Sequence, residues 1–596
     1  MPDASNQTIA EMLRGIGEYL AMQDIPFKPR AYEKAAQVID GLEEEAAEMY
    51  KKGGIKALEE IPGVGKSIAE KIEELIKTGR VKYYEELKKK TPVDLTELSR
   101  VEGLGPKSVK KLYQKLGVEN LADLEKAAVA GKIGKLEGFG KKSEEKILKS
   151  IGFAKQSGAG GAGGGARFIL GQTLPQIRAI QARLEAVAGI SKVTIAGSAR
   201  RCKETIGDAD ILAVAGGKAD VVARAMETFL KTPGVVNVIA HGETKSSIKL
   251  KSGLNVDLRV VPAESYGAAL NYFTGSKDHN VALRKIAVAK GWRLNEYGLF
   301  KDATRKGKAA GKLIAGRTEE ELYAAFGMDY IEPELRENTG EIEAARAHKL
   351  PKLIGYKDLQ GDLQIQTDWT DGAESIEQMA RKAAEAGLKY IVITDHTKRL
   401  AMTHGLDEKR IVQQWAEIDR VNKKLAGKIR VLKGSECDIL KDGSLDLPDS
   451  ILAKLDVVGV SVHSHFNLSR ADQTARVRRA IENPNADVFF HPTGRIINRR
   501  AAIELDMDEI LTVAKKTGTV MEINCFPERA DLKDEYIRHC VDIGVKLSID
   551  SDAHNSKHYL NLEYGIAQAR RGWATRADVI NAWPVEKMLG SLKDGR

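Results

Sequence analysis

Cysteine is scarce in this chain. The 596 residues include four cysteines, Cys202, Cys437, Cys525 and Cys540, and no two of them form a CxxC pair. Scattered cysteines exclude a disulfide framework and are typical of a reducing compartment. We therefore expect a cytoplasmic protein.

Long apolar runs are also missing. No stretch approaches the roughly 20 apolar residues that a membrane-spanning helix needs. The opening segment MPDASNQTIAEMLRGIGEYL has early acidic residues and no apolar signal core. Both absences argue against a membrane partner. The chain is instead 42% hydrophobic and 30% charged with a net charge of +9, which allows buried cores and favours a polyanionic partner.

Glycine and alanine mark one clear boundary. Residues 157–166, SGAGGAGGGA, have the composition of a flexible tether. A second boundary is predicted at 339–358, in a polar stretch without a long apolar period. Beyond it, strand-like runs such as YIVITDH and VVGVSVHS alternate with helical stretches, which predicts βα units and a parallel sheet or barrel.

An internal repeat occupies the N-terminal region. IPGVGKSIAEKI (61–72), VEGLGPKSVKKL (101–112) and LEGFGKKSEEKI (136–147) each place Gly-x-Gly before a lysine-bearing amphipathic helix. The glycines allow a tight turn, and the helix start offers free N–H groups to an anion. One such turn alone would be an ordinary helix break, but three copies favour binding to the DNA phosphate backbone. The predicted contacts are Gly63, Gly65, Lys66 and Lys71, then Gly103, Gly105 and Lys107, then Gly138, Gly140 and Lys141.

The clearest chemical signal is a group of carboxylates. In IAGSARRCKETIGDADILAV, Asp208 and Asp210 are two residues apart in a strand-like context and point from one face. Asp257, in GLNVDLRVV, suits a neighbouring strand. Three carboxylates can hold two Mg²⁺ ions that activate a hydroxyl and stabilise the leaving oxygen of a phosphoryl transfer. An accidental Asp-x-Asp in a solvated turn is the alternative, and Gly197, Ser198 and Arg201 upstream argue against it, because they can clamp a triphosphate.

Residues 1–338 resemble the family X DNA polymerases, the group containing polymerase beta. GSARRCKETIGDADIL is similar to the palm signature of that family, and NYFTGSKDHNVALR (271–284) to its nucleotide-binding subdomain. The resemblance implies that Asp208, Asp210 and Asp257 bind Mg²⁺ or Mn²⁺, with deoxynucleoside triphosphates and gapped or primer–template DNA as partners. It also implies that Gly197, Ser198, Arg201 and Gly207 face the triphosphate, that Tyr272, Phe273 and Gly275 lie along its sugar, and that Asn280 and Arg284 lie near the nascent base pair.

Three positions leave alternatives open. Tyr272 and Phe273 are equally compatible with core packing. Cys202 stands where many relatives have glycine, which affects the turn behind Arg201. Lys71 matches the Schiff-base lysine with which some relatives remove a 5′-deoxyribose phosphate. Ser67 replaces a neighbouring lysine of those relatives, so plain phosphate binding by Lys71 is favoured.

Residues 359–596 resemble a PHP phosphoesterase domain, a distorted (β/α)7 barrel that holds Mn²⁺ or Zn²⁺. The resembling stretches are GDLQIQTDWTDG, VITDH, GSECDI, SVHSHFN, FFHPTGR and IDSDAH. The resemblance implies seven metal ligands: Asp371, His396, Glu436, His463, His491, Asp552 and His554. Gln364 and Gln366 occupy the two places of the family's first HxH motif. An amide oxygen is a weaker donor than imidazole, so we expect reduced metal occupancy and weakened 3′–5′ exonuclease or phosphoesterase activity.

The sequence thus predicts a multidomain α/β protein. The expected order is a small lyase-like helical domain with the first helix-hairpin-helix (1–80), a helix-hairpin-helix region (81–156), the tether (157–166), a nucleotidyltransferase palm (167–262), a thumb-like nucleotide-binding subdomain (263–338), a linker (339–358) and the PHP domain (359–596). We expect a monomeric repair polymerase that fills short gaps. The alternatives are a template-independent nucleotidyltransferase and a DNA-binding scaffold with inactive sites.

Overall fold

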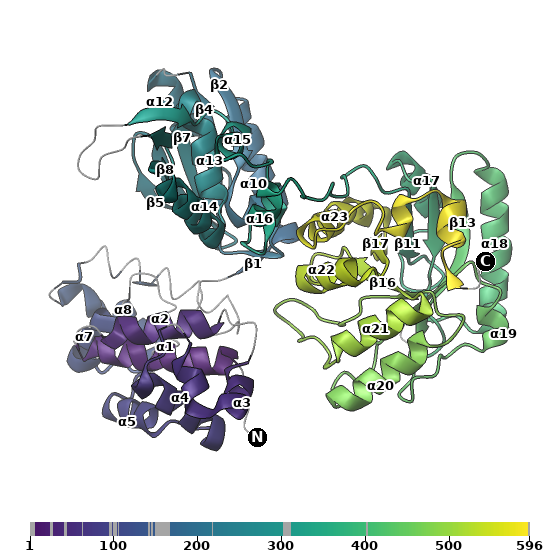
Figure 1. The fold of residues 1–596 in the computed structure, drawn as a ribbon, viewed down its shortest axis with the longest axis horizontal. Helices are drawn as coiled ribbons and strands as arrows, with labels where there is room; N and C mark the ends of the chain where they lie inside the picture. The colour runs from purple at the N-terminus through teal and green to yellow at the C-terminus, as the bar shows by residue number, and fades with distance from the viewer. Residues whose placement is uncertain are drawn as a thin grey trace. The chain divides into compact units, whose positions relative to one another are not determined.

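The computed structural model describes residues 6–593 except for the following: 24, 26–27, 41–44, 62, 95–97, 99–103, 105, 137, 141–143, 145–146, 149–166, 217–218, 302–310 and 401–402. The chain forms two compact units, residues 1–166 and residues 167–596 (Figure 1). The predicted tether 157–166 lies outside the described residues. No helix among the described residues is long and apolar enough to cross a membrane.

The first unit is helical in its described part. Its elements are α1 (Asn6–Met22), α2 (Lys28–Asp40), α3 (Ala46–Glu59), α4 (Lys66–Thr78), α5 (Lys82–Lys90), α7 (Pro106–Leu116), α8 (Leu121–Val129) and the 3-10 helix η1 (Ile133–Lys135). Helix α4 shows why the sequence folds this way. Its buried residues Ile68, Ile72 and Leu75 recur every three or four positions and form one apolar face. The helix ends at Gly79, whose left-handed backbone closes the last turn.

A five-stranded mixed sheet begins the second unit. Its strands are β2 (Ile190–Ile195), β4 (Asp208–Ala215), β5 (Val235–His241), β6 (Lys245–Leu250) and β7 (Asn255–Val261), in the order β2-β4-β7-β6-β5. Only the β4–β7 pair is parallel. Helices α10 (Leu170–Glu185) and α12 (Ala219–Leu230) pack against it (Figure 1), and the short strands β1 (Phe168–Ile169) and β3 (Thr205–Ile206) pair beside it.

A second, smaller layer follows the sheet. It contains α13 (Tyr266–Thr274), α14 (Lys277–Ala289), the antiparallel strands β8 (Trp292–Asn295), β9 (Gly298–Lys301) and β10 (Lys312–Ala315), α15 (Glu319–Phe326) and α16 (Glu341–Arg346). Helix α16 falls within 339–358, the predicted linker. Its residues Ile342 and Ala345 are buried in the apolar core of this layer, together with Leu322 and Phe326 of α15.

The C-terminal half is a nearly closed parallel barrel. Its seven strands follow chain order: β11 (Gly361–Ile365), β12 (Tyr390–Ile393), β13 (Arg430–Asp438), β14 (Val457–Ser461), β15 (Val488–Phe489), β16 (Val520–Asn524) and β17 (Leu547–Asp550). A parallel bridge between Ile365 and Ala553 brings the first strand beside the end of the last. The covering helices are α17 (Ile376–Glu385), α18 (Glu408–Lys424), α19 (Asp449–Leu452), α20 (Arg470–Ile481), α21 (Met507–Thr517), α22 (Asp534–Ile543), α23 (Leu562–Arg571) and α24 (Val585–Leu589).

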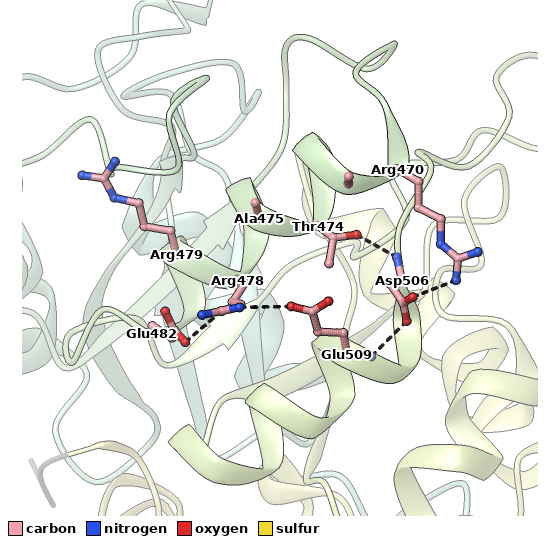
Figure 2. Close-up of a pocket in the computed structure, with 9 residues that line it drawn as sticks. Arg470, Thr474, Ala475, Arg478, Arg479, Glu482, Asp506 and Glu509 are labelled. Carbon is pink, nitrogen blue, oxygen red and sulfur yellow. Dashed lines mark hydrogen bonds and ion pairs between the residues drawn. The ribbon is translucent and has the colours of Figure 1, made fainter.

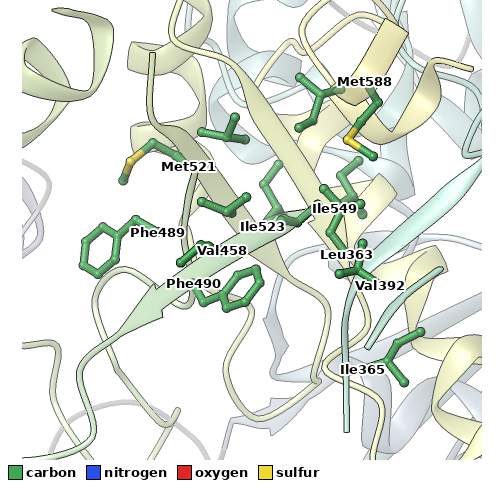
Figure 3. Close-up of a cluster of buried hydrophobic side chains, with 14 of the residues drawn as sticks. Leu363, Ile365, Val392, Val458, Phe489, Phe490, Met521, Ile523, Ile549 and Met588 are labelled. Carbon is green, nitrogen blue, oxygen red and sulfur yellow. The ribbon is translucent and has the colours of Figure 1, made fainter. Parts of the chain in front are cut away.

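Successive side chains along each barrel strand point to opposite faces of the sheet. Leu363, Ile523 and Ile549 belong to one large buried apolar cluster (Figure 3). Gln364 and Glu522 alternate with them and point to the opposite face, although both are fully buried. The predicted fold class is therefore confirmed: a helical N-terminal region, a mixed palm sheet and a C-terminal barrel of the PHP type.

Candidate active sites

The palm carboxylates lie on two adjacent parallel strands. In the β4–β7 register, Asp210 is paired directly with Asp257, and Asp208 with Asn255. Gly197 approaches from the preceding turn with φ +65, and a Cβ on it would lie 2.8 Å from Oδ2 of Asp210. Only glycine allows the backbone to pass so close to the carboxylate. The structure thus brings the three predicted carboxylates and Gly197 together.

The charge of this cluster is not balanced by the protein alone. Burial, with the charges of Asp208 and Asp257, raises the pKa of Asp210 to about 7. Two cations act on the cluster: the charges of Arg259 and Lys245 oppose the rise in the pKa of Asp210, and Nζ of Lys245 lies 3.1 Å from Oδ2 of Asp257. A raised pKa among close carboxylates is what divalent cations relieve, because their charge favours the ionised form. The donor set therefore fits Mg²⁺ or Mn²⁺.

The triphosphate clamp predicted upstream forms a short helix, α11 (Gly197–Arg200). Ser198 is partly buried on it, and Arg201 caps its C-terminal end. Nε of Arg201 donates to Oε1 of Glu337 over 3.0 Å, and Nη1 donates to the carbonyl of Thr274. Gly207 lies in the exposed bend before β4. The clamp is therefore held by the smaller layer as well as by the palm.

Cys202 adopts a backbone conformation that suits glycine. Its φ is +53, in the left-handed region that residues with a Cβ rarely occupy. Glycine adopts this conformation without the steric cost that a Cβ brings. The turn behind Arg201 is therefore kept here with a cysteine, at the cost of local strain.

The predicted nucleoside contacts gather around α13 and α14. Tyr272, Asn280 and Arg284 line one small cleft, where Nδ2 of Asn280 donates to the carbonyl of Tyr272 over 2.7 Å. Tyr272 is 38% exposed. Phe273 is partly buried and lies under the guanidinium of Arg259, 4.4 Å from the ring centroid. Gly275, with φ +71, approaches Nη1 of Arg201, which would be 3.1 Å from a Cβ there. Core packing thus describes Phe273 better than Tyr272.

The described glycines of the predicted hairpins adopt two backbone conformations. Gly63 and Gly138 have φ near +87 and +85, as a tight turn requires, whereas Gly65 is extended and caps the start of α4. Lys66 is exposed beside it. Gly140 is exposed in the third copy, while Gly103, Gly105 and Lys141 lie outside the described residues, as does the side chain of Lys107.

Lys71 is engaged within its own helix. Its Nζ donates to the carbonyl of Ser67 over 3.0 Å and bonds the Ser67 hydroxyl at 3.1 Å. It also lies 4.9 Å from the ring centroid of Tyr83. Burial, with the nearby charge of Lys28, lowers the pKa of Lys71, against the opposing effect of the glutamates on the same helix.

Seven predicted ligands gather at one end of the barrel. Asp371 follows β11, His396 follows β12, Glu436 lies in β13, His463 follows β14, His491 follows β15, and Asp552 and His554 follow β17. Because the carboxyl ends of parallel strands meet at one rim, this placement brings distant ligands together. Residues in that rim form two groups whose ligand atoms lie within 4.8 Å of one another: Asp371, His396 and His554, and His396, Glu436 and His463.

Glu436 is at the centre of the second group. Its Oε1 lies 2.8 Å from Nε2 of His491 and 3.1 Å from Nε2 of His463. Burial would raise the pKa of Glu436, but the charges of the surrounding imidazoles hold it well below its usual range. In the first group, Oδ2 of Asp371 lies 3.6 Å from Nε2 of His396 and 3.5 Å from Nε2 of His554.

Several buried polar atoms around this rim make no hydrogen bond among the described residues. Nδ1 of His396, Nδ1 of His491 and Oε1 of Glu522 are buried without a hydrogen bond. Two ligands, His491 with φ +30 and Asp552 with φ +52, have strained backbones of the kind found at functional sites. Imidazole and carboxylate donors in this arrangement fit a Zn²⁺ or Mn²⁺ centre.

The two glutamines lie inside the cage. Nε2 of Gln366 donates to Oε2 of Glu436 over 2.7 Å, and Oε1 of Gln364 accepts from Nδ2 of Asn524 over 3.1 Å. The same Asn524 amide group also contacts Oδ2 of Asp552 at 3.1 Å. Amide N–H groups therefore occupy lone pairs of Glu436 and Asp552 that a metal ion would otherwise use.

One cavity lies away from both sites. It has a volume of about 630 Å³ between α20 and α21 on the barrel surface (Figure 2). Its arginines are paired: Arg470 with Asp506 at 3.0 Å and Arg478 with Glu509 at 3.3 Å. This open, charge-balanced surface includes none of the predicted ligands.

Several side chains near the two sites were not predicted. Among them, Lys245 reaches the palm carboxylates, and Asp438 accepts from Nδ1 of His463 at 3.2 Å. Arg571 donates to the Arg201 carbonyl, and Arg495 pairs with Glu204, between Arg201 and Gly207. Asp438 follows the quoted GSECDI ligand Glu436 by two positions, a spacing that could have indicated it. The other three depend on contacts between distant segments, for which no local pattern exists.

Comparison with known proteins covers nearly the whole chain. Family models match residues 4–81 as a helix-hairpin-helix domain, 95–152 as a SAM-like helix-hairpin-helix tandem, 269–337 as a DNA polymerase beta thumb and 362–525 as a PHP domain. The DNA polymerase/3′-5′ exonuclease PolX of Bacillus subtilis (strain 168) is 37% identical over 588 residues, which are 98% of this chain and 99% of that protein. A probable phosphatase of Thermoanaerobacter sp. (strain X514) is 29% identical over 230 residues, 37% of this chain and 88% of its own length.

Proposed function

Because the chain belongs to the family X DNA polymerases that carry a C-terminal PHP domain, we propose that it fills short gaps in DNA with deoxynucleotides under the direction of a template. The register that pairs Asp210 with Asp257 on adjacent parallel strands carries this proposal. Together with Asp208, these side chains would hold two divalent ions, Mg²⁺ or Mn²⁺, which lower the pKa of the primer hydroxyl and stabilise the leaving pyrophosphate oxygen.

The surrounding residues take the roles expected from the sequence. Gly197, Ser198, Arg201 and Gly207 bind the triphosphate, Tyr272, Phe273 and Gly275 follow the sugar, and Asn280 and Arg284 approach the nascent base pair. The free helix starts and lysines of the hairpins, among them Gly65 and Lys66, bind DNA phosphates on either side of the gap. The cleft shared by Tyr272, Asn280 and Arg284 supports the base-pair assignment.

Primer extension separates this function from its rivals. On a one-nucleotide gap, extension should require the templating base, whereas a template-independent transferase would extend the same primer without it. Asp208→Ala should abolish extension. An unchanged rate in Asp208→Ala would support a DNA-binding scaffold with inactive sites and would contradict the proposal.

For the barrel we propose a depleted metal centre. Asp371, His396 and His554 would hold one Mn²⁺ or Zn²⁺ ion, and Glu436, His463 and His491 a second, while Asp552 lies beside the glutamines. The bond from Gln366 to Glu436 supports weakened 3′–5′ exonuclease or phosphoesterase activity, because it uses an oxygen of the carboxylate nearest the imidazoles. We further propose that the protein acts as a cytoplasmic monomer.

Lys71 supports phosphate binding better than lyase chemistry. A Schiff-base lysine must present a neutral amine, and burial does lower the pKa of Lys71. However, its Nζ makes two hydrogen bonds with Ser67. Ser67 also stands at the position where lyase-active relatives have a second lysine. We therefore propose that Lys71 contacts a DNA phosphate.

A further inference from the structure

An arginine of the barrel reaches the triphosphate clamp of the palm. Arg571 is the last residue of α23, and its side chain is 2% exposed. Its Nη1 donates to the backbone carbonyl of Arg201 over 2.8 Å and to Oε1 of Glu337 over 3.1 Å. Its Nη2 is held by Oδ2 of Asp534 at 2.5 Å. A buried guanidinium with three such partners is fixed in place rather than free to move between rotamers.

The same glutamate also fixes Arg201. Oε1 of Glu337 accepts from Nε of Arg201 over 3.0 Å, and the Thr274 carbonyl accepts from Nη1. Among the described residues, Nη2 of Arg201 has no partner. Arg571 therefore acts on Arg201 from two directions: directly on its backbone carbonyl, and through Glu337 on its side chain. The guanidinium is held with one nitrogen left for an anion.

A second barrel residue contacts the segment that carries the clamp residues, 197–207. Nη2 of Arg495 lies 2.5 Å from Oε2 of Glu204, and the side chain of Arg495 is 7% exposed. Glu204 follows Arg201 by three positions, and Arg495 follows His491, a predicted barrel ligand, by four. The palm packs closely on the barrel here, because a Cβ on Gly171 would lie 2.6 Å from Pro527. The barrel thus contacts this segment at two points, the hydrogen bond from Arg571 to the Arg201 carbonyl and the ion pair between Arg495 and Glu204.

We propose that Arg571 is a positioning residue for nucleotide binding by the polymerase, so that the PHP domain shapes the polymerase site. Arg571 presets Arg201 with Nη2 directed toward the triphosphate. Without it, Glu337 interacts with Arg201 and Lys203 alone, since Lys203 Nζ already lies 3.7 Å away, and the Arg201 side chain is drawn toward the carboxylate. The inference rests on the proposed role of Arg201 at the triphosphate.

Loss of the Arg571 side chain would weaken nucleotide binding more than it would slow the chemical step. Arg201 is expected to hold phosphate oxygens equally in the ground and transition states, so misplacing it raises KM and leaves kcat unchanged. Displacement of a positioning group costs on the order of tenfold or more. We expect Arg571→Ala to raise the KM for the incoming nucleotide about tenfold, with kcat within about twofold of the wild type. Arg571→Lys should give a smaller rise, because an ammonium cannot reproduce the planar fork.

The test is steady-state filling of a one-nucleotide gap by the full chain. Arg201→Ala is the reference. Arg201→Ala combined with Arg571→Ala should show no further rise in KM, because Arg571 acts through Arg201 and the two effects do not add. Arg178→Ala is the matched control: Arg178 pairs with Glu563 of the barrel at 2.8 Å, is half exposed and does not touch the clamp. It should leave KM unchanged.

Each outcome decides the inference. A wild-type KM in Arg571→Ala, an additive double variant, or an equal effect of Arg178→Ala would overturn it. If thermal unfolding shows that Arg571→Ala is not folded, Arg571→Lys replaces it in the assay. A wild-type KM in Arg571→Lys would then overturn the inference. An unchanged KM in Arg201→Ala would instead remove the proposed triphosphate role of Arg201, and with it this inference, whatever Arg571→Ala shows.

Discussion

A buried carboxylate joins the palm to the nucleotide-binding layer, and its removal should cost measurable stability. Glu319, the first residue of α15, is 3% exposed at its side chain. Two parallel bonds of 2.9 and 2.6 Å connect it to Arg200, and Arg336, which is fully buried, lies 2.5 Å away. We consider Glu319→Gln, which keeps the shape of the side chain and removes its charge.

The expected loss of unfolding free energy follows from the pKa of Glu319. Burial alone would raise the pKa of Glu319, but Arg336 and Arg200 lower it from 4.5 to about 2. A difference of between two and three pH units corresponds to about 3 kcal/mol of folding free energy. Removing one partner of a buried ion pair costs about 3–5 kcal/mol, because the remaining charges stay buried. We therefore expect Glu319→Gln to lower the free energy of unfolding by about 3 kcal/mol.

Urea denaturation followed by tryptophan fluorescence provides the assay, since Trp292 lies 6.0 Å from Phe326 of α15. Glu320→Gln, an exposed neighbour on the same helix, is the matched control and should change stability little. Because the folded pKa of Glu319 is depressed, the difference between wild type and Glu319→Gln should be constant above pH 4.5 and shrink as the pH falls toward 2. A loss no larger than that of the control would refute the reasoning.

Two further predictions concern the other sites. Gln366→His, assayed with a 3′-labelled strand and Mn²⁺, should increase 3′-end degradation by about ten- to a hundredfold, because imidazole restores a metal donor beside Glu436; full wild-type degradation that Gln366→His leaves unchanged would contradict the depleted centre. Borohydride treatment with an abasic substrate should give no covalent adduct, because Lys71 Nζ is bonded to Ser67; an adduct that disappears in Lys71→Arg would establish lyase chemistry.

Local patterns predicted the palm triad, and the reason is physical. Strand alternation places Asp208 and Asp210 on one face whatever the rest of the chain does. A further aspartate in an apolar, strand-like context, Asp257, then needs only an adjacent strand to join them, and β7 is that strand. The predicted barrel ligands came from the resemblance to the PHP family, and the structure gathers them at one rim because they lie in or after strands that run parallel.

Contacts between domains could not be predicted in this way. Arg571 and Arg201 are separated by 370 positions, and their meeting depends on how the barrel packs on the palm. The surroundings of Gln366 could be predicted only in part. Its place in the metal motif is evident from the sequence, but its hydrogen bond to Glu436 depends on how the barrel folds. Nor did the sequence reveal α16 inside the predicted linker, because two buried apolar residues, Ile342 and Ala345, are too few to show a helical period.

We propose that carboxylates on β4 and β7 hold the divalent ions with which this polymerase joins a nucleotide to a primer. Single-turnover filling of a one-nucleotide gap by Asp210→Asn tests it most directly, with Asp220→Asn, an exposed aspartate on α12, as the control. We predict that Asp210→Asn slows the step on the order of a thousandfold or more while gap binding persists, because stabilisation of the transition state by the metal ions is lost. A rate equal to that of the wild type and of Asp220→Asn would contradict the account.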